Sequence, residues 1–145
     1  MPRPRAFLVV GRADWGKSWT LRALTPKWGR VLLCGRAFFV RRMSNDDQPA
    51  GFEKFLNALD TSPKAYVVLA YCPERGSPSL LKILQRKFMV FSWVLEHDWY
   101  CTDTVSRDEI ALLKEQTTKV EVFRLLRRPA SMRARALRDF IARHI

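Results

Sequence analysis

The clearest candidate for chemistry in this chain is an octapeptide, Gly11-Arg12-Ala13-Asp14-Trp15-Gly16-Lys17-Ser18. It has the pattern G-x-x-x-x-G-K-[ST], which holds phosphate groups when it lies between a strand and a helix. Gly11 and Gly16 allow the backbone to turn so that successive N–H groups converge on phosphate oxygens. Lys17 would reach the β and γ phosphates, and the Ser18 hydroxyl would bind the Mg²⁺ that bridges them. The octapeptide therefore predicts a site for a nucleoside triphosphate with Mg²⁺.

The residues on either side of the octapeptide have the patterns that such a site needs. Residues 6–10 form a short unbroken apolar run, which is typical of a strand buried on both faces. Residues 17–24 have apolar or small residues at Trp19, Leu21, Ala23 and Leu24, and Pro26 ends this predicted helix. The N-terminus of the helix would add its positive field to that of the lysine. We expect the nucleotide to contact Gly11, Arg12, Ala13, Asp14, Trp15, Gly16, Lys17, Ser18 and Trp19.

In this context the octapeptide resembles the phosphate loop of the P-loop NTPase superfamily. The resemblance in specific residues is confined to the octapeptide, and the order of strands and helices extends it along the chain. A compact chain without long insertions is more similar to the small nucleotide and metabolite kinases than to motor or recombinase folds. The resemblance implies ATP or another nucleoside triphosphate, Mg²⁺, and either hydrolysis or phosphoryl transfer. No Asn-Lys-x-Asp motif and no Asp-x-x-Gly after a strand is present, which disfavours a Ras-like GTPase.

Four more apolar strands and four more helices are predicted beyond the octapeptide. The strands are residues 31–40, 65–72, 88–95 and 120–126, and Gly35 with Arg36 indicates either a bulge in the first of these or a hairpin. The helices are expected around residues 52–59, from Ser77 or Ser79 to Arg86, from 107 to 116 after a capping box at Ser106, and after Ser131. Strands that alternate with helices predict one domain, residues 1–145, with a three-layer α/β/α fold. Its sheet would be five-stranded and mostly parallel, and the resemblance implies the strand order 2-3-1-4-5.

The last helix is predicted to be amphipathic. Its expected inner face is Met132, Ala136, Leu137, Phe140, Ile141 and Ile145, with Arg135, Arg138 and Arg143 outside. Trp93, Trp99 and Tyr100 are expected to be core and rim aromatics, because they are not interleaved with Lys or Arg.

The acid that would organise Mg²⁺ is less evident. Superfamily members commonly place an Asp at the end of the third strand, but residues 67–74 of this chain contain none. Glu74, just beyond that strand, is a candidate for this acid or for positioning water. Asp46 and Asp47 could bind the metal or a substrate cation, or could form an ordinary turn. Glu96, His97 and Asp98 end the fourth strand, where they could be an acid–base group or a surface loop.

Arginines could stabilise the charge that develops on a transferred phosphoryl group. Arg127 and Arg128 directly follow the fifth strand, on the side where ligands bind in such sheets. Arg41 and Arg42 follow the second strand in the same way. Each could equally be a solvated surface residue, and we expect at least one of the four to contact phosphate.

The chain is strongly cationic, with 26 Lys and Arg against 14 Asp and Glu and a formal net charge of +12. Residues 1–42 carry ten cations and one acid, residues 43–118 eight and eleven, and residues 119–145 eight and two. The basic ends suggest an alternative function, a nucleic-acid-associated module with a regulatory or degenerate nucleotide site. A third possibility is a subunit whose protein partner supplies the missing acid or arginine.

Composition and patterning also exclude several classes of protein. The 48% hydrophobic content excludes a wholly disordered basic tail. No apolar run approaches the roughly 18 to 20 residues of a membrane span, and the N-terminal run is too short for a signal peptide. Three widely spaced cysteines, Cys34, Cys72 and Cys101, favour neither a disulfide framework nor a zinc site, so we expect a cytoplasmic protein.

Overall fold

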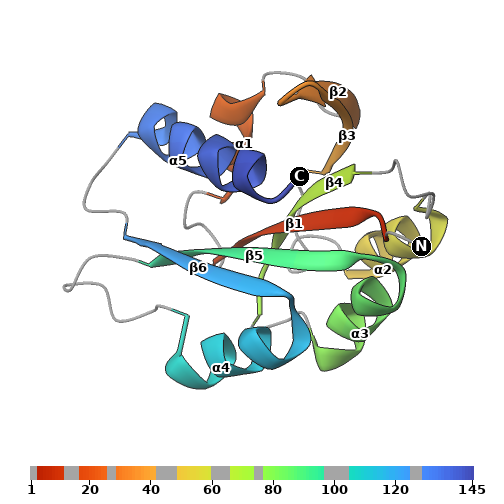
Figure 1. Ribbon diagram of the computed structural model, residues 1–145. Helices are drawn as coiled ribbons and strands as arrows, with labels where there is room; N and C mark the ends of the chain where they lie inside the picture. Colours follow the sequence, from red (N-terminus) through yellow and green to blue (C-terminus); the bar gives the residue numbers. More distant parts are fainter. Residues whose placement is uncertain are drawn as a thin grey trace.

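The computed structural model describes residues 3–11, 17–25, 29–41, 49–59, 66–73, 77–96, 105–124 and 129–145, which form an α/β fold (Figure 1). The strands are β1 (Arg5–Val10), β2 (Gly29–Leu33), β3 (Arg36–Arg41), β4 (Tyr66–Tyr71), β5 (Met89–Glu96) and β6 (Lys119–Arg124). The helices are α1 (Lys17–Leu24), α2 (Pro49–Ala58), α3 (Ser77–Lys87), α4 (Arg107–Gln116) and α5 (Ala130–Arg143). None of these helices has both the length and the apolar character of a membrane-spanning helix.

The sheet of the described residues is six-stranded and mixed, so the predicted five-stranded sheet is wrong. The strand order is β2-β3-β4-β1-β5-β6, and only the pair β2 and β3 is antiparallel. The additional strand arises because residues 31–40, for which Gly35 and Arg36 predict either a bulge or a hairpin, form the hairpin. Its two turn residues, Cys34 and Gly35, have φ angles of 50° and 76°, as a tight hairpin turn requires. The five parallel strands alone run in the order second, third, first, fourth, fifth along the sheet.

Helices cover both faces of the sheet (Figure 1). One apolar cluster packs α1 and α5 against one face, and a second packs α2, α3 and α4 against the other. β1 lies in the middle of the sheet between β4 and β5, and its residues 6–10 are fully buried, as the apolar run predicts. The central position of β1 places the end of this strand at the middle of one sheet edge.

Aromatic rings fill the core under α1 and α5. The Phe7 ring stacks on Phe91 at 5.1 Å between centroids and meets the edge of Phe140 at 6.2 Å. Trp93 is fully buried against Phe123, with 5.0 Å between ring centroids, which confirms that Trp93 is a core residue. Rings of this size account for much of the buried apolar area of a small domain.

The start of α4 is confirmed, whereas the start and inner face of α5 differ from the prediction. Ser106 and Glu109 form the reciprocal capping box before α4. α5 begins one residue before Ser131, after Pro129, and it has no side-chain cap. Its buried residues are Ala134, Leu137, Phe140 and Ile141, and Met132 is 50% exposed. Met132 is therefore wrongly predicted to face inward.

His144, at the C-terminal end of α5, should make stability depend on pH. Its ring packs on Phe91 and Phe140, with 5.0 and 4.9 Å between centroids. Burial lowers the pKa of His144, and Arg143, Lys119 and Arg5 lower it further against the opposing effect of Glu121. Protonation of His144 is less favourable in the folded state than in the unfolded state. Its contribution to the free energy of unfolding is therefore complete above pH 6.5, the usual pKa, and is lost as the pH falls below that value.

The comparison of thermal unfolding for the wild type and His144→Phe at pH 7.5 and 5.5 checks this prediction. The wild type should lose more stability on acidification than the variant, which keeps an aromatic ring and cannot be protonated there. Other titrating groups are common to both proteins, so an equal loss in the two would contradict it.

Candidate phosphate-binding site

The candidate site lies where β1 ends and α1 begins. The Gly11 N–H donates to the Tyr71 carbonyl at 3.1 Å, which extends the pairing of β1 with β4 by one residue. α1 starts at Lys17, so its N-terminus lies at the carboxyl edge of the parallel strands. This confirms the strand-then-helix context that the octapeptide needs, whereas Arg12, Ala13, Asp14, Trp15 and Gly16 lie outside the described residues.

Lys17 is held against the end of β1. It is only 6% exposed, and its Nζ donates to the Gly11 carbonyl oxygen at 2.7 Å. A Cβ at Gly11 would lie 3.4 Å from the Lys17 Cγ and 3.7 Å from the Leu95 Cβ. The lysine stem therefore packs directly beside the backbone of Gly11. The site holds a buried ammonium group at the start of a helix.

The first turn of α1 has one polar and one exposed aromatic residue beside Lys17. Ser18 is half-buried and directly follows the lysine in α1. Trp19 is 64% exposed, and the Arg22 guanidinium lies 5.2 Å from its ring centroid. The inner face of α1 consists of Lys17, Thr20, Leu21 and Leu24, whereas Trp19 and Ala23 are exposed. Two polar residues, Lys17 and Thr20, therefore take buried positions in this helix.

Arg133 is a candidate that the motif search missed. Its Nε donates to the Thr20 Oγ1 at 2.9 Å, and Thr20 is one helical turn from Lys17 on the same buried face. Burial lowers the pKa of Arg133, but an arginine stays protonated at any physiological pH. The helical period would have identified it, because Arg133 lies four residues before the buried Leu137. A second cation is therefore fixed near the lysine.

The end of β4 has no carboxylate. Tyr71 is 1% exposed, and burial raises the pKa of its phenol above the usual range, with further increases from Cys72 and Glu109. Cys72, fully buried, follows in line with Gly11 in the parallel register. Tyr71 is therefore neutral at pH 7, and Glu74, the candidate acid, lies outside the described residues.

Comparison with family models, curated proteins and solved structures finds no match to this chain. Its function must therefore be inferred from the chemistry of its own residues.

Two other candidates from the sequence have partners away from Lys17. Arg41, at the end of β3, lies over the Phe55 ring at 4.9 Å, and burial lowers its pKa. Glu96, at the end of β5, pairs with Arg124 at 4.0 Å, and both side chains are more than a third exposed. This exposed ion pair indicates that Glu96 is a surface residue and does not favour an acid–base role.

Most of the remaining candidates fall outside the described residues. They are Arg42, Asp46, Asp47, His97, Asp98, Trp99, Tyr100, Arg127 and Arg128. Within the described ranges, no group of three His, Cys, Asp or Glu side chains could hold a metal ion.

Proposed function

We propose that this chain binds a nucleoside triphosphate, ATP in preference to GTP, at the junction of β1 and α1. The observation that carries the proposal is the buried Lys17 ammonium, which opens α1 and contacts the carbonyl of Gly11 at 2.7 Å. Burying a charge is costly unless a partner compensates it. A phosphate group is a strong partner for an ammonium group, because both carry a full charge.

The surroundings of Lys17 also favour an anion. The N-terminus of α1 carries partial positive charge, and Arg133 adds a full charge through its bond to Thr20. The order of the five parallel strands agrees with the order that the P-loop NTPase resemblance implies, which supports the proposal, although the whole sheet is six-stranded and mixed, with β2 at its edge. The site is at the carboxyl edge of the sheet, where ligands of such folds bind.

The proposed reaction is hydrolysis or transfer of the γ-phosphoryl group. Ser18 would bind Mg²⁺ through its hydroxyl, and its half-buried place beside Lys17 fits that role. Glu74, Asp46 or Asp47 would complete the metal site, which supplies charge neutralisation during transfer. Arg127 and Arg128 would stabilise the transferred group. The free thiols of Cys34 and Cys72 favour a reducing compartment, the cytoplasm.

Calorimetric titration and thermal unfolding with ATP-Mg²⁺, GTP-Mg²⁺ and AMP test the proposal. ATP-Mg²⁺ should bind and stabilise the fold by about 2.7 kcal/mol at a concentration of 100 times its Kd. AMP should bind far more weakly, because it lacks the β and γ phosphates that Lys17 would contact. Absence of binding by both triphosphates, or equal binding of AMP, would refute the assignment. Release of phosphate during incubation then distinguishes a catalyst from a binding protein.

A further inference from the structure

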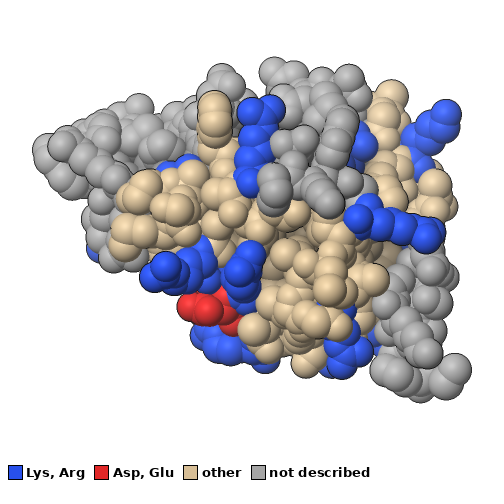
Figure 2. Space-filling model, turned by 90° about the horizontal axis from the view of Figure 1, so that it is seen from above, with Lys and Arg blue, Asp and Glu red and all other residues tan. Residues whose placement is uncertain are grey.

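Charge is distributed unequally between the two helical layers. α1 and α5 together carry six Lys and Arg and one acid, Asp139. α2, α3 and α4 together also carry six Lys and Arg, but with four acids. Figure 2, which views the molecule from the side of α1 and α5, shows blue side chains spread over this face and little red. The layer of α1 and α5 therefore has the larger net positive charge, because it carries fewer acids for the same number of cations.

The two helices of this layer form one continuous surface. The Arg133 Nε donates to Thr20, and one Arg138 Nη donates to the Leu24 carbonyl at 3.1 Å. The two arginines follow one another along α5 in the same order as their partners along α1, so the two helices lie side by side and run in the same direction. The thiol of Cys34, in the hairpin turn, lies 3.9 Å from the Arg138 carbonyl oxygen. The hydrogen bonds between α1 and α5 fix the orientation of the two helices, and so of their outer faces, relative to one another.

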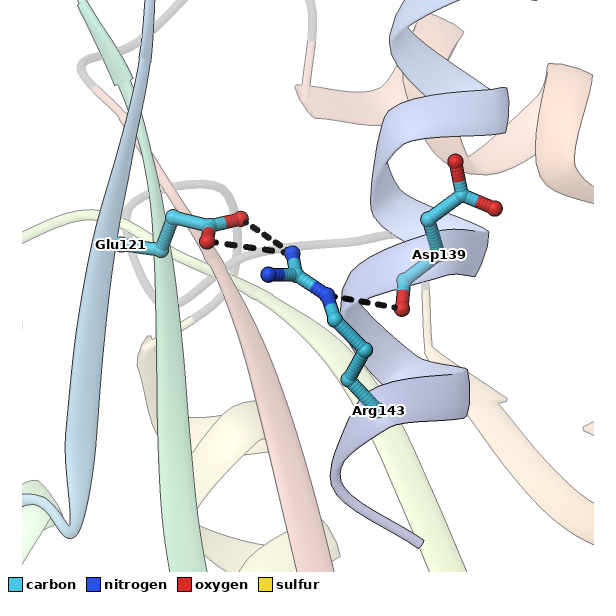
Figure 3. Close-up of polar contacts among 3 residues, drawn as sticks. All are labelled: Glu121, Asp139 and Arg143. Atoms are coloured by element: carbon cyan, nitrogen blue, oxygen red, sulfur yellow. Dashed lines mark hydrogen bonds and ion pairs between the residues drawn. The ribbon is translucent and has the colours of Figure 1, made fainter.

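Three arginines and a tryptophan face outward on this layer. Trp19 and Arg22 are exposed on α1, opposite its buried residues, and Arg135 and Arg138 are exposed on α5. We call these four residues the arginine face. Arg143 is excluded because the Glu121 carboxylate neutralises its charge, with both carboxylate oxygens bound at 2.9 and 3.0 Å (Figure 3), whereas the Leu24 carbonyl that Arg138 binds is uncharged.

Trp19 gives the arginine face a property that a solvated cationic surface lacks. A tryptophan that is 64% exposed gains little from the core, and its ring has the Arg22 guanidinium 5.2 Å away. Nucleobases stack on exposed aromatic rings, and arginines beside the ring contact phosphates of the same strand. Duplex DNA keeps its bases stacked inside the helix, so this combination suits unpaired bases.

We propose that the arginine face binds single-stranded nucleic acid, with Trp19 as a stacking platform for a base and Arg22, Arg135 and Arg138 as phosphate contacts. Trp19, which the sequence also predicts to contact the nucleotide, is here assigned to the single strand, whereas the proposed nucleotide site centres on the buried Lys17. Charge complementarity alone would also admit an acidic protein, but such a partner offers no base to Trp19.

Fluorescence anisotropy with labelled oligo(dT) and oligo(U) of about 16 nucleotides, longer than the smallest single-strand sites, tests the proposal. The first variant removes two charges, Arg22→Gln with Arg135→Gln. Each phosphate contact contributes about −0.7 to the slope of log affinity against log salt for single strands, so this variant should flatten the slope by about 1.4. Lys82→Gln with Lys114→Gln removes two exposed charges from α3 and α4 and should leave the slope unchanged.

The second variant addresses the tryptophan. Trp19→Ala should weaken oligonucleotide binding roughly 5- to 150-fold, the range of one base stack, and Trp19→Phe should retain most of it. Poly-aspartate, a polyanion without bases, is the probe for charge alone, and Trp19→Ala should not change its binding. Lys17→Met should lose the binding of ATP and retain the binding of oligonucleotides, so the two proposals can fail independently. No binding at low salt, equal effects of the two charge variants, or an unchanged affinity of Trp19→Ala would overturn the inference.

Discussion

Replacing Lys17 by methionine should weaken the binding of ATP-Mg²⁺ by about 30-fold or more. Removing one partner of a buried, hydrogen-bonded charge pair typically costs about 2–5 kcal/mol, because the other charge loses its compensation. Methionine keeps an unbranched apolar stem, which packs beside Gly11 where the closest approach to a Cβ would be 3.4 Å. The variant therefore removes the ammonium group and little else. Calorimetric titration of ATP-Mg²⁺ into both proteins measures the difference.

A lysine on the opposite helical layer provides the matched control. Lys114 is exposed on α4, so Lys114→Met makes the same chemical change and the same change in net charge far from β1. It should leave the affinity for ATP-Mg²⁺ within about twofold of the wild type, because exposed charges are screened by salt. Equal losses in both variants would show that ATP responds to overall charge and does not bind at the start of α1.

The parallel strands and the site lysine could be predicted from sequence because local patterns determine them. Residues 6–10 are an unbroken apolar run and are fully buried, and α1 begins at the Lys17 of the motif. The hairpin of β2 and β3 was harder to recognise. Its turn has Cys34 at the first of two positions with positive φ, where Asn, Asp or Gly is the usual signal.

Burial of polar residues also limited what periodicity could predict about the site. In α1 the buried face includes Lys17 and Thr20 while the large Trp19 is 64% exposed, so apolar residues alone do not identify this face. The helical period places Arg133 one turn before Leu137, but nothing in the apolar pattern indicates its bond to the buried Thr20 hydroxyl. A search for apolar faces cannot find polar groups that are buried to hold a ligand or each other.

The orientation of α5 can be tested directly, because Phe140→Ala should destabilise the fold by about 3–5 kcal/mol. Phe140 is fully buried and packs edge-to-face with Phe7, with 6.2 Å between the ring centroids. Truncation therefore leaves a cavity under the helix that carries Arg133. Met132→Ala, on the same helix and 50% exposed, should cost less than about 0.5 kcal/mol. Urea unfolding of both variants measures the two losses, and Phe140→Leu provides a milder truncation if the alanine variant is largely unfolded. Similar losses from Met132→Ala and either Phe140 variant would contradict the assigned orientation of α5, in which helical packing places Phe140 on the sheet and Met132 in solvent.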